Sequence, residues 1–131
     1  MKYTAHYSQL VMPDHINVIG TLFGGQMISW MDIAAAKVAY RFLEGTEAVG
    51  AVTRAIDKIE FREPVYSGEW VNFESTVVDT GNSSLKIRVD AVAEGRKRGK
   101  RLACVGFFTM VSVIQNKKGQ FLKFRHGQSC E

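Results

Sequence analysis

The sequence predicts an α+β fold in which one long helix packs against a curved antiparallel sheet of about five strands. Three observations support this fold class. A single apolar run over residues 26–43 contains no proline and has the length and alanine content of a helix. After Gly45 the apolar residues recur with a period of two, as they do in strands. The connections between the later strands are short, which implies antiparallel pairing.

The first expected element is a strand within residues 3–12, which Pro13 ends because proline cannot donate to a strand ladder. Residues 14–23 have the composition of a loop, and the helix opens after Gly24-Gly25. Gly45 is expected to end the helix in the left-handed conformation that glycine adopts most easily.

Four further strands are expected. The first alternates imperfectly, which indicates a bulge, and the last is apolar almost throughout, which indicates a central strand. They span residues 49–61, 70–79, 85–94 and 102–114. One domain is expected over residues 1–131, with a loose tail from about residue 120 to 131.

The helix is apolar on nearly every side, whereas a surface helix has a polar half. It should therefore be buried, with the sheet around it and a second subunit beside it.

Composition narrows the possible classes of protein. No stretch has the ~20 uncharged apolar residues that span a bilayer. The first ten residues lack the apolar segment of a secretory signal, so a cytoplasmic protein without a membrane partner is expected. Cys104 lies in an apolar run and Cys130 in a polar tail, and two such cysteines form no disulfide framework. The three histidines are scattered, and no metal is expected.

The net charge of +4 is concentrated in the basic run over residues 96–101, which includes Arg96 and Arg98. This run is either a solvated hairpin turn or a site for phosphate groups. No aromatic residues are interleaved with it, and the sequence contains no nucleic-acid-binding motif. A small polyanionic ligand is therefore favoured over nucleic acid.

Asp32 is the first candidate for chemistry. Its helical neighbours three and four positions away include no cation, so no local ion pair neutralises it. A buried and unpaired carboxylate is costly, which favours a functional role. The alternative is that Asp32 lies on one wet stripe of the helix with Gln26, Ser29 and Lys37.

Gly24-Gly25 is the second candidate, because no Ser, Thr, Asp or Asn immediately precedes the helix to accept its first N–H groups. These amides suit an anion or a polarised carbonyl oxygen, although two glycines can also simply form a tight entry to the helix. A carbonyl over Gly25 would lie roughly 10 Å along the axis from Asp32 of the same helix. Direct attack therefore needs an Asp from another subunit, or a carbonyl placed deeper.

Asn17, in the loop before the helix, is the third candidate. It can orient a water molecule or the reacting bond, or it can serve only as a turn former. The sequence contains no Gly-x-Ser-x-Gly motif, which argues against a serine hydrolase of the α/β class.

Residues 13–25, followed by Met31-Asp32, resemble the signature of hotdog-fold acyl-CoA thioesterases, most closely the YciA type and the related brain-type cytosolic acyl-CoA hydrolases. The resemblance covers about residues 6–119. Weaker matches lie at residues 61–65 with Gly68-Glu69, at residues 81–84 and at residues 107–111.

This resemblance implies a homodimer with two active sites at the subunit interface, often assembled further into trimers of dimers. It implies that Asp32 acts as general base or nucleophile and that Asn17 comes from the other subunit. The amide near Gly25 would form the oxyanion hole. An interface site also resolves the distance between Gly25 and Asp32.

In this family the phosphates of coenzyme A meet basic residues at the sheet edge. Gly24 and the turn residues Arg96 and Arg98 are accordingly expected to contact coenzyme A, and Ser83 and Ser84 are expected beside its chain.

The expected reaction is hydrolysis of a fatty acyl-CoA thioester to a free acid and coenzyme A, with no further cofactor. The main alternative is a non-catalytic hotdog protein that binds acyl-CoA. A hotdog dehydratase would need a His–acid pair, for which His15 is the only nearby histidine.

Overall fold

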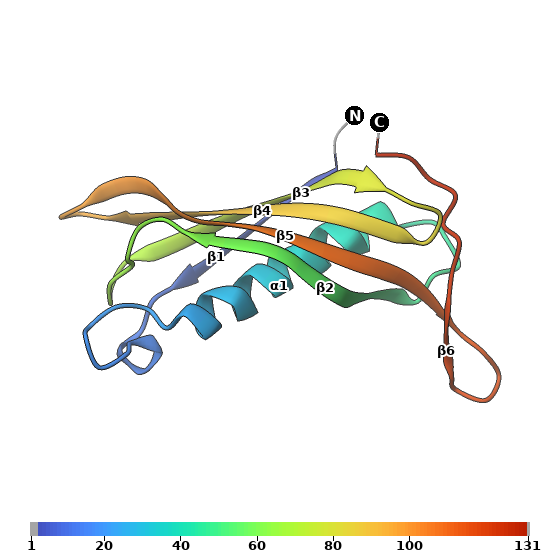
Figure 1. Ribbon diagram of the computed structural model, residues 1–131, viewed down its shortest axis with the longest axis horizontal. Helices are drawn as coiled ribbons and strands as arrows, with labels where there is room; N and C mark the ends of the chain where they lie inside the picture. The colour runs from blue at the N-terminus through green and yellow to red at the C-terminus, as the bar shows by residue number, and fades with distance from the viewer. Residues whose placement is uncertain (1–2, 131) are drawn as a thin grey trace.

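One long helix lies across one face of a curved antiparallel sheet, as the sequence predicts (Figure 1). The computed structural model describes residues 3–130. The strand order is β1-β3-β4-β5-β2, and a short β6 pairs with β5. The elements are β1 (Thr4–Leu10), η1 (Pro13–His15), α1 (Gly24–Phe42), β2 (Gly50–Phe61), β3 (Trp70–Thr80), β4 (Ser84–Gly95), β5 (Gly99–Gln115) and β6 (Phe121–Lys123).

The five strands expected from the sequence are confirmed to within a few residues, and so is the end of the helix. Gly45 has a φ of 84°, the left-handed conformation expected just beyond a helix. The predicted bulge in β2 is also confirmed, because its register against β5 shifts between Thr53 and Ala55 and again between Ile56 and Lys58.

The core lies between α1 and the inner face of the sheet. Along β4 the alternate side chains of Leu85, Ile87 and Val89 are fully buried, each contributing about 1.5–3 kcal/mol relative to exposure. At Gly106 of β5 the core is packed so closely that an added Cβ would lie 2.9 Å from the terminal methyl of Met31 on α1. A side chain at this position would require the ends of the neighbouring core side chains to shift.

Part of the helix remains uncovered within one protomer. Ser29 and Lys37 are exposed, and so are the large apolar side chains of Ile33 (47%) and Tyr40 (74%). The sheet thus buries one side of the helix, as expected, and leaves the other side exposed in the protomer. The remaining stripe is the part that a second subunit would have to cover.

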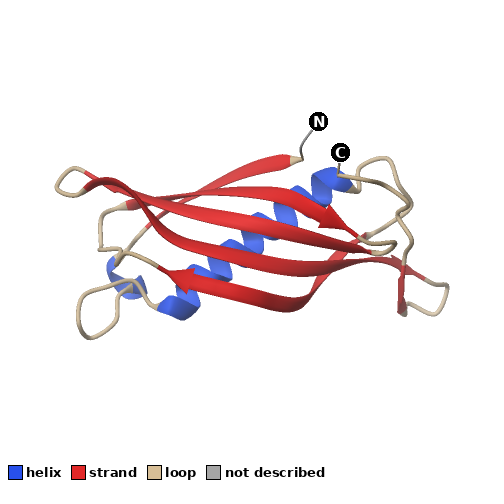
Figure 2. Ribbon diagram, turned by 45° about the horizontal axis from the view of Figure 1, so that its top comes forward, coloured by secondary structure: helices blue, strands red, loops and turns tan. Residues whose placement is uncertain are grey.

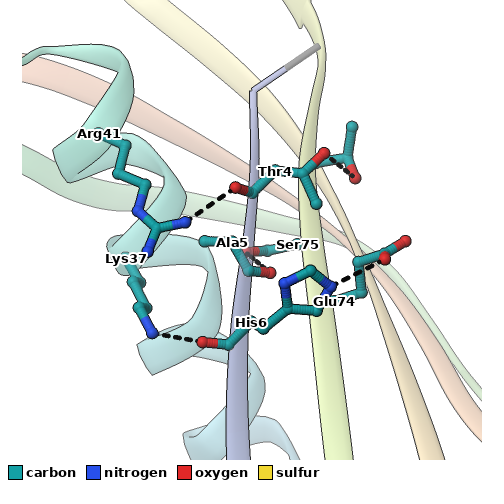
Figure 3. Close-up of polar contacts among 8 residues, drawn as sticks. Thr4, Ala5, His6, Lys37, Arg41, Glu74 and Ser75 are labelled. Atoms are coloured by element: carbon teal, nitrogen blue, oxygen red, sulfur yellow. Dashed lines mark hydrogen bonds and ion pairs between the residues drawn. The ribbon is translucent and has the colours of Figure 1, made fainter.

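The two edges of the sheet differ in how their backbone groups are satisfied. At β1, Arg41 donates to the carbonyl oxygen of Thr4 and Lys37 to that of His6, so side chains from α1 cover this edge (Figure 3). At β2 no strand of the described chain pairs with the outer edge. An uncovered edge of twelve residues is a template for another strand.

The expectation of a loose tail is wrong for residues 120–130. Residues 121–123 form β6 against the end of β5, and the ring of His126 is buried (7% exposed). His126 packs edge-on against Phe42, and its Nε2 donates a hydrogen bond to the carbonyl oxygen of Ser84. The physical reason is that β5 continues past its pairing with β4, which leaves the backbone of Val113, Ile114 and Gln115 free to pair.

No helix within residues 3–130 is long and apolar enough to cross a membrane.

Candidate active site

Asp32 lies half-buried in the middle of α1 and faces β2. Its Oδ1 accepts a hydrogen bond of 2.6 Å from the hydroxyl of Thr53. No Lys, Arg or His of the described residues forms an ion pair with it. The carboxylate is therefore oriented by a neutral donor through its Oδ1 atom.

Sequence reasoning did not identify Thr53. A single threonine in a strand carries no signal, because threonine is common there. Its position opposite Asp32 depends on how the bulged strand β2 lies over the helix, and local sequence does not specify this.

The start of α1 presents uncapped amides. Phe23 occupies the N-cap position and no side chain caps the helix, as the sequence predicts. An added Cβ on Gly25 would meet nothing within 4 Å, so the backbone there is open to a ligand. A cavity of about 340 Å³ adjoins Gly24, with apolar walls that include Leu22, Met27 and Phe61. Amides with positive partial charge beside an apolar cavity suit a polarised carbonyl group.

The side chain of Asn17 holds its own loop together. Its Oδ1 accepts hydrogen bonds from the amides of Ile19 and Thr21, and its Nδ2 donates to the Thr21 hydroxyl at 2.9 Å. These contacts fix the loop that enters α1 and leave the second hydrogen of Nδ2 for another acceptor.

The basic turn lies at the same end of the molecule as the start of α1 (Figures 1 and 2). The guanidinium of Arg98 stacks over the ring of Tyr66, 3.7 Å from its centroid. Tyr66 in turn forms an isolated β-bridge with Thr21, in the loop before the helix. Arg96 is exposed and lines a cavity of about 710 Å³. Contacts thus connect the turn to the helix entry.

Ser84 begins β4, and Ser83 precedes it. This start of β4 lies at the opposite end of the sheet from the basic turn (Figure 1), and His126 joins it to the end of α1 by contacting both Ser84 and Phe42. The length of β4 separates the two serines from the basic turn by roughly 35 Å, from a rise of about 3.3 Å per residue. Within one protomer the structure therefore does not bring them together with Gly24, Arg96 and Arg98.

A buried ion pair anchors the basic turn at its base. Arg101 donates two hydrogen bonds to the carboxylate of Glu69, at 2.6 and 2.9 Å, and one to the carbonyl oxygen of Pro64. Hydrogen bonds from Arg101 are the main reason why the pKa of Glu69 lies below its usual range. Because Glu69 already neutralises it, Arg101 is not an available cation for a ligand.

His15 packs edge-on against Trp30, and its Nδ1 accepts a hydrogen bond of 2.9 Å from the amide of Met12. The ring therefore has a structural role in the loop. Within the described part of the chain, no three His, Cys, Asp or Glu side chains are grouped so that they could hold a metal ion.

The sequence model of the Thioesterase superfamily matches residues 19–100. An uncharacterized acyl-CoA thioester hydrolase of Buchnera aphidicola is 37% identical over 113 residues, which cover 85% of this chain and 81% of that protein. The acetyl-coenzyme A thioesterase of Mus musculus is 28% identical over 117 residues. This alignment covers 88% of the chain, which spans only 20% of the mouse protein.

Among solved structures, the hexameric thioesterase of Yersinia pestis superposes with a TM-score of 0.76 at 27% identity, covering 95% of this chain and 94% of that one.

Proposed function

Because the chain belongs to the thioesterase superfamily, we propose that it hydrolyses acyl-CoA thioesters to a free acid and coenzyme A, with the carboxylate of Asp32 as the reacting group. One observation carries this proposal. Asp32 is half-buried, has no ion-pair partner among the described residues, and is oriented by the Thr53 hydroxyl at 2.6 Å.

Two routes use the same groups. As a general base, the free oxygen of Asp32 takes a proton from water while the water oxygen attacks the thioester carbonyl, and collapse of the tetrahedral intermediate releases the thiolate. As a nucleophile, Asp32 attacks the carbonyl, the thiolate leaves, and water hydrolyses the resulting anhydride. In both routes the amide of Gly25 donates to the developing oxyanion, a contribution of about 3 kcal/mol for one such donor.

The site is proposed to form between two subunits, because Gly25 and Asp32 of one helix lie roughly 10 Å apart. The uncovered edge of β2, next to the exposed side chains of Val52 and Ile56, supports pairing with β2 of a second copy. Asn17 and Gly25 of one subunit would then face Asp32 of the other. A homodimer is the minimum assembly, and a trimer of dimers would match the hexamer reported for the Yersinia pestis relative.

The proposal includes the contacts with coenzyme A. Gly24 lies beside the thioester, and Arg96 and Arg98 receive the phosphates at the same end of the protomer. Ser83 and Ser84 lie at the far end, so they contribute only from the partner subunit.

The reaction as proposed uses the carboxylate, backbone amides and water, with coenzyme A as part of substrate and product. A cytoplasmic location completes the proposal, and the two free cysteines are consistent with a reducing compartment.

Release of free thiol from acyl-CoA substrates of increasing chain length tests the proposal. The wild-type protein should release coenzyme A from at least one substrate, and Asp32→Asn should reduce this rate at least about 100-fold while coenzyme A still binds. Asp57→Asn is a matched control, because Asp57 also accepts a threonine hydrogen bond, from Thr109, but is exposed on the other face of the sheet. Binding of acyl-CoA without any thiol release would instead support the non-catalytic binding protein.

A further inference from the structure

The end of β5 and the short strand β6 form a hairpin that projects from the rest of the sheet (Figure 1). This tail hairpin, defined as residues 113–125, lies at the opposite end of the molecule from the basic turn and the start of α1. Asn116 orders its turn, because Oδ1 of Asn116 accepts hydrogen bonds of 2.9 Å from the amides of Lys118 and Gln120. The tail hairpin therefore presents its side chains in a fixed arrangement.

Two neighbouring apolar side chains of the tail hairpin are exposed to solvent. Phe121 is 62% exposed and Leu122 is 49% exposed. Because successive side chains of a strand point to opposite faces, the hairpin presents one of the two on each of its faces. A flat partner that covered one face would leave the apolar side chain of the other face in water. Both are removed from water only by a partner that surrounds the hairpin.

Cations accompany these apolar side chains. Lys117 and Lys118 lie in the turn, Lys123 and Arg125 follow Leu122, and all four side chains are exposed. None of the four forms an ion pair with a described residue. The sequence contains no Asp or Glu from position 95 to position 130. The tail hairpin thus carries four positive charges that no ion pair neutralises, and these charges attract an anionic partner.

A lipid surface fits this combination of groups better than a protein does. Stable protein–protein interfaces take about 20–30 residues from each side, and the tail hairpin offers fewer than that. Segments that lie in a membrane interface combine a few buried apolar side chains with Lys and Arg, whose long side chains reach the phosphates. A headgroup layer surrounds whatever enters it, so it would cover Phe121 and Leu122 together.

We propose that the tail hairpin docks the protein on an anionic lipid surface, with Phe121 and Leu122 in the headgroup layer and the four cations against lipid phosphates. The sequence predicts no membrane partner because it lacks a spanning segment, but contact with a membrane surface needs none. The inference does not rest on the proposed function, since it uses none of the residues assigned to the reaction.

Sedimentation with vesicles tests the proposal on the whole protein. The wild type should bind vesicles of phosphatidylcholine and phosphatidylserine in equal amounts more tightly than phosphatidylcholine alone, and added salt should weaken this binding. Lys117→Gln with Lys118→Gln should lower the affinity roughly 25-fold, about fivefold for each cation removed. Phe121→Ser with Leu122→Ser keeps the charge and should still lower the affinity at least about tenfold, because the apolar side chains are lost.

Two control variants remove similar groups elsewhere. Lys97→Gln with Lys100→Gln removes two exposed cations from the turn at the other end of the sheet. Val78→Ser removes an apolar side chain of β3 that is 43% exposed, close to the value for Leu122. Both should bind the mixed vesicles as the wild type does, because screening confines each charge to its own surroundings. Thermal melting establishes that each variant is folded.

Loss of binding in the two hairpin variants alone supports the proposal. An equal loss in the Lys97 and Lys100 variant, or equal binding to vesicles without phosphatidylserine, would overturn the assignment to the tail hairpin. If the wild type ignores both vesicles but binds polyglutamate through Lys117 and Lys118, the partner is an acidic protein and the lipid proposal is wrong. If Phe121→Ser with Leu122→Ser instead gives a smaller assembly in solution and no vesicle binding is seen, the hairpin lies between copies of this chain.

Discussion

Removing the charge of Glu69 should destabilise the protein strongly, although Glu69 takes no part in the proposed reaction. Glu69 is 5% exposed, and its Oε1 also accepts the amide of Tyr66 at 2.9 Å. In Glu69→Gln the Arg101 side chain, which is only 14% exposed, loses its counter-charge. Loss of one partner from a buried pair typically costs about 3–5 kcal/mol. For a chain of this length that corresponds to a fall in Tm of roughly 10–20 °C.

The effect should depend on pH in a defined direction. Because the pKa of Glu69 is lowered in the folded protein, the pair stabilises the fold above the ordinary Glu pKa of about 4.3. This stability is lost as the pH falls through the lower, folded-state pKa. The difference in unfolding free energy between wild type and Glu69→Gln should therefore be largest at pH 7 and should decrease below about pH 4.

Urea unfolding at a series of pH values measures the loss of unfolding free energy in Glu69→Gln and its dependence on pH. Glu47→Gln is the control, because Glu47 is exposed and has no ion-pair partner among the residues described. The double variant Glu69→Gln with Arg101→Met should recover part of the loss, because it removes the unpaired charge. A loss below about 1 kcal/mol at pH 7, or one that does not change with pH, would refute this reasoning.

Three further predictions follow from single contacts. Thr53→Val should lower kcat about tenfold to a hundredfold in the thiol-release assay, because it removes the hydrogen bond that orients Asp32. Gly106→Ala should cost about 1–3 kcal/mol in urea unfolding, because its Cβ would lie within 3.0 Å of three core side chains. Cys104 should resist a thiol reagent at pH 8 in the folded protein, because burial raises its pKa to about 11.

Each of these predictions has an internal control. Thr109→Val, which removes the matching hydrogen bond to Asp57 on the other face of the sheet, should leave kcat unchanged. Gly50→Ala should leave stability nearly unchanged, because an added Cβ there meets nothing within 4 Å. Cys130 is only partly buried and should react first. Equal effects of the paired variants, or equal rates of the two thiols, would count against the contacts named.

Local sequence predicts the elements of this fold well, because the helix and four of the strands carry strong periodic signals. The sequence does not predict β6, since this strand has three residues and owes its existence to the unpaired end of β5. Thr53 is unpredictable for a related reason. Its contact with Asp32 depends on how β2 lies against α1, and such non-local packing leaves no pattern in the sequence near Thr53.

The candidate site is only partly predictable from local sequence. Asp32 and the uncapped start of α1 were recognisable, because an acid without a cation and a helix without a cap are local anomalies. The sequence leaves Asn17 with two possible roles, as a site residue or as a turn former, and in the structure its side chain holds the loop together.

Subunit complementation tests most directly whether Asp32 works across the subunit interface. Asp32→Asn and Asn17→Ala should each be nearly inactive alone. When the two variants are unfolded together in equal amounts and refolded, half of the dimers should be mixed, and each mixed dimer should contain one intact site. The mixture should then recover about a quarter of the wild-type hydrolysis of acyl-CoA. Activity no greater than the sum of the separate variants, with mixed dimers shown to be present, would contradict a site shared between subunits.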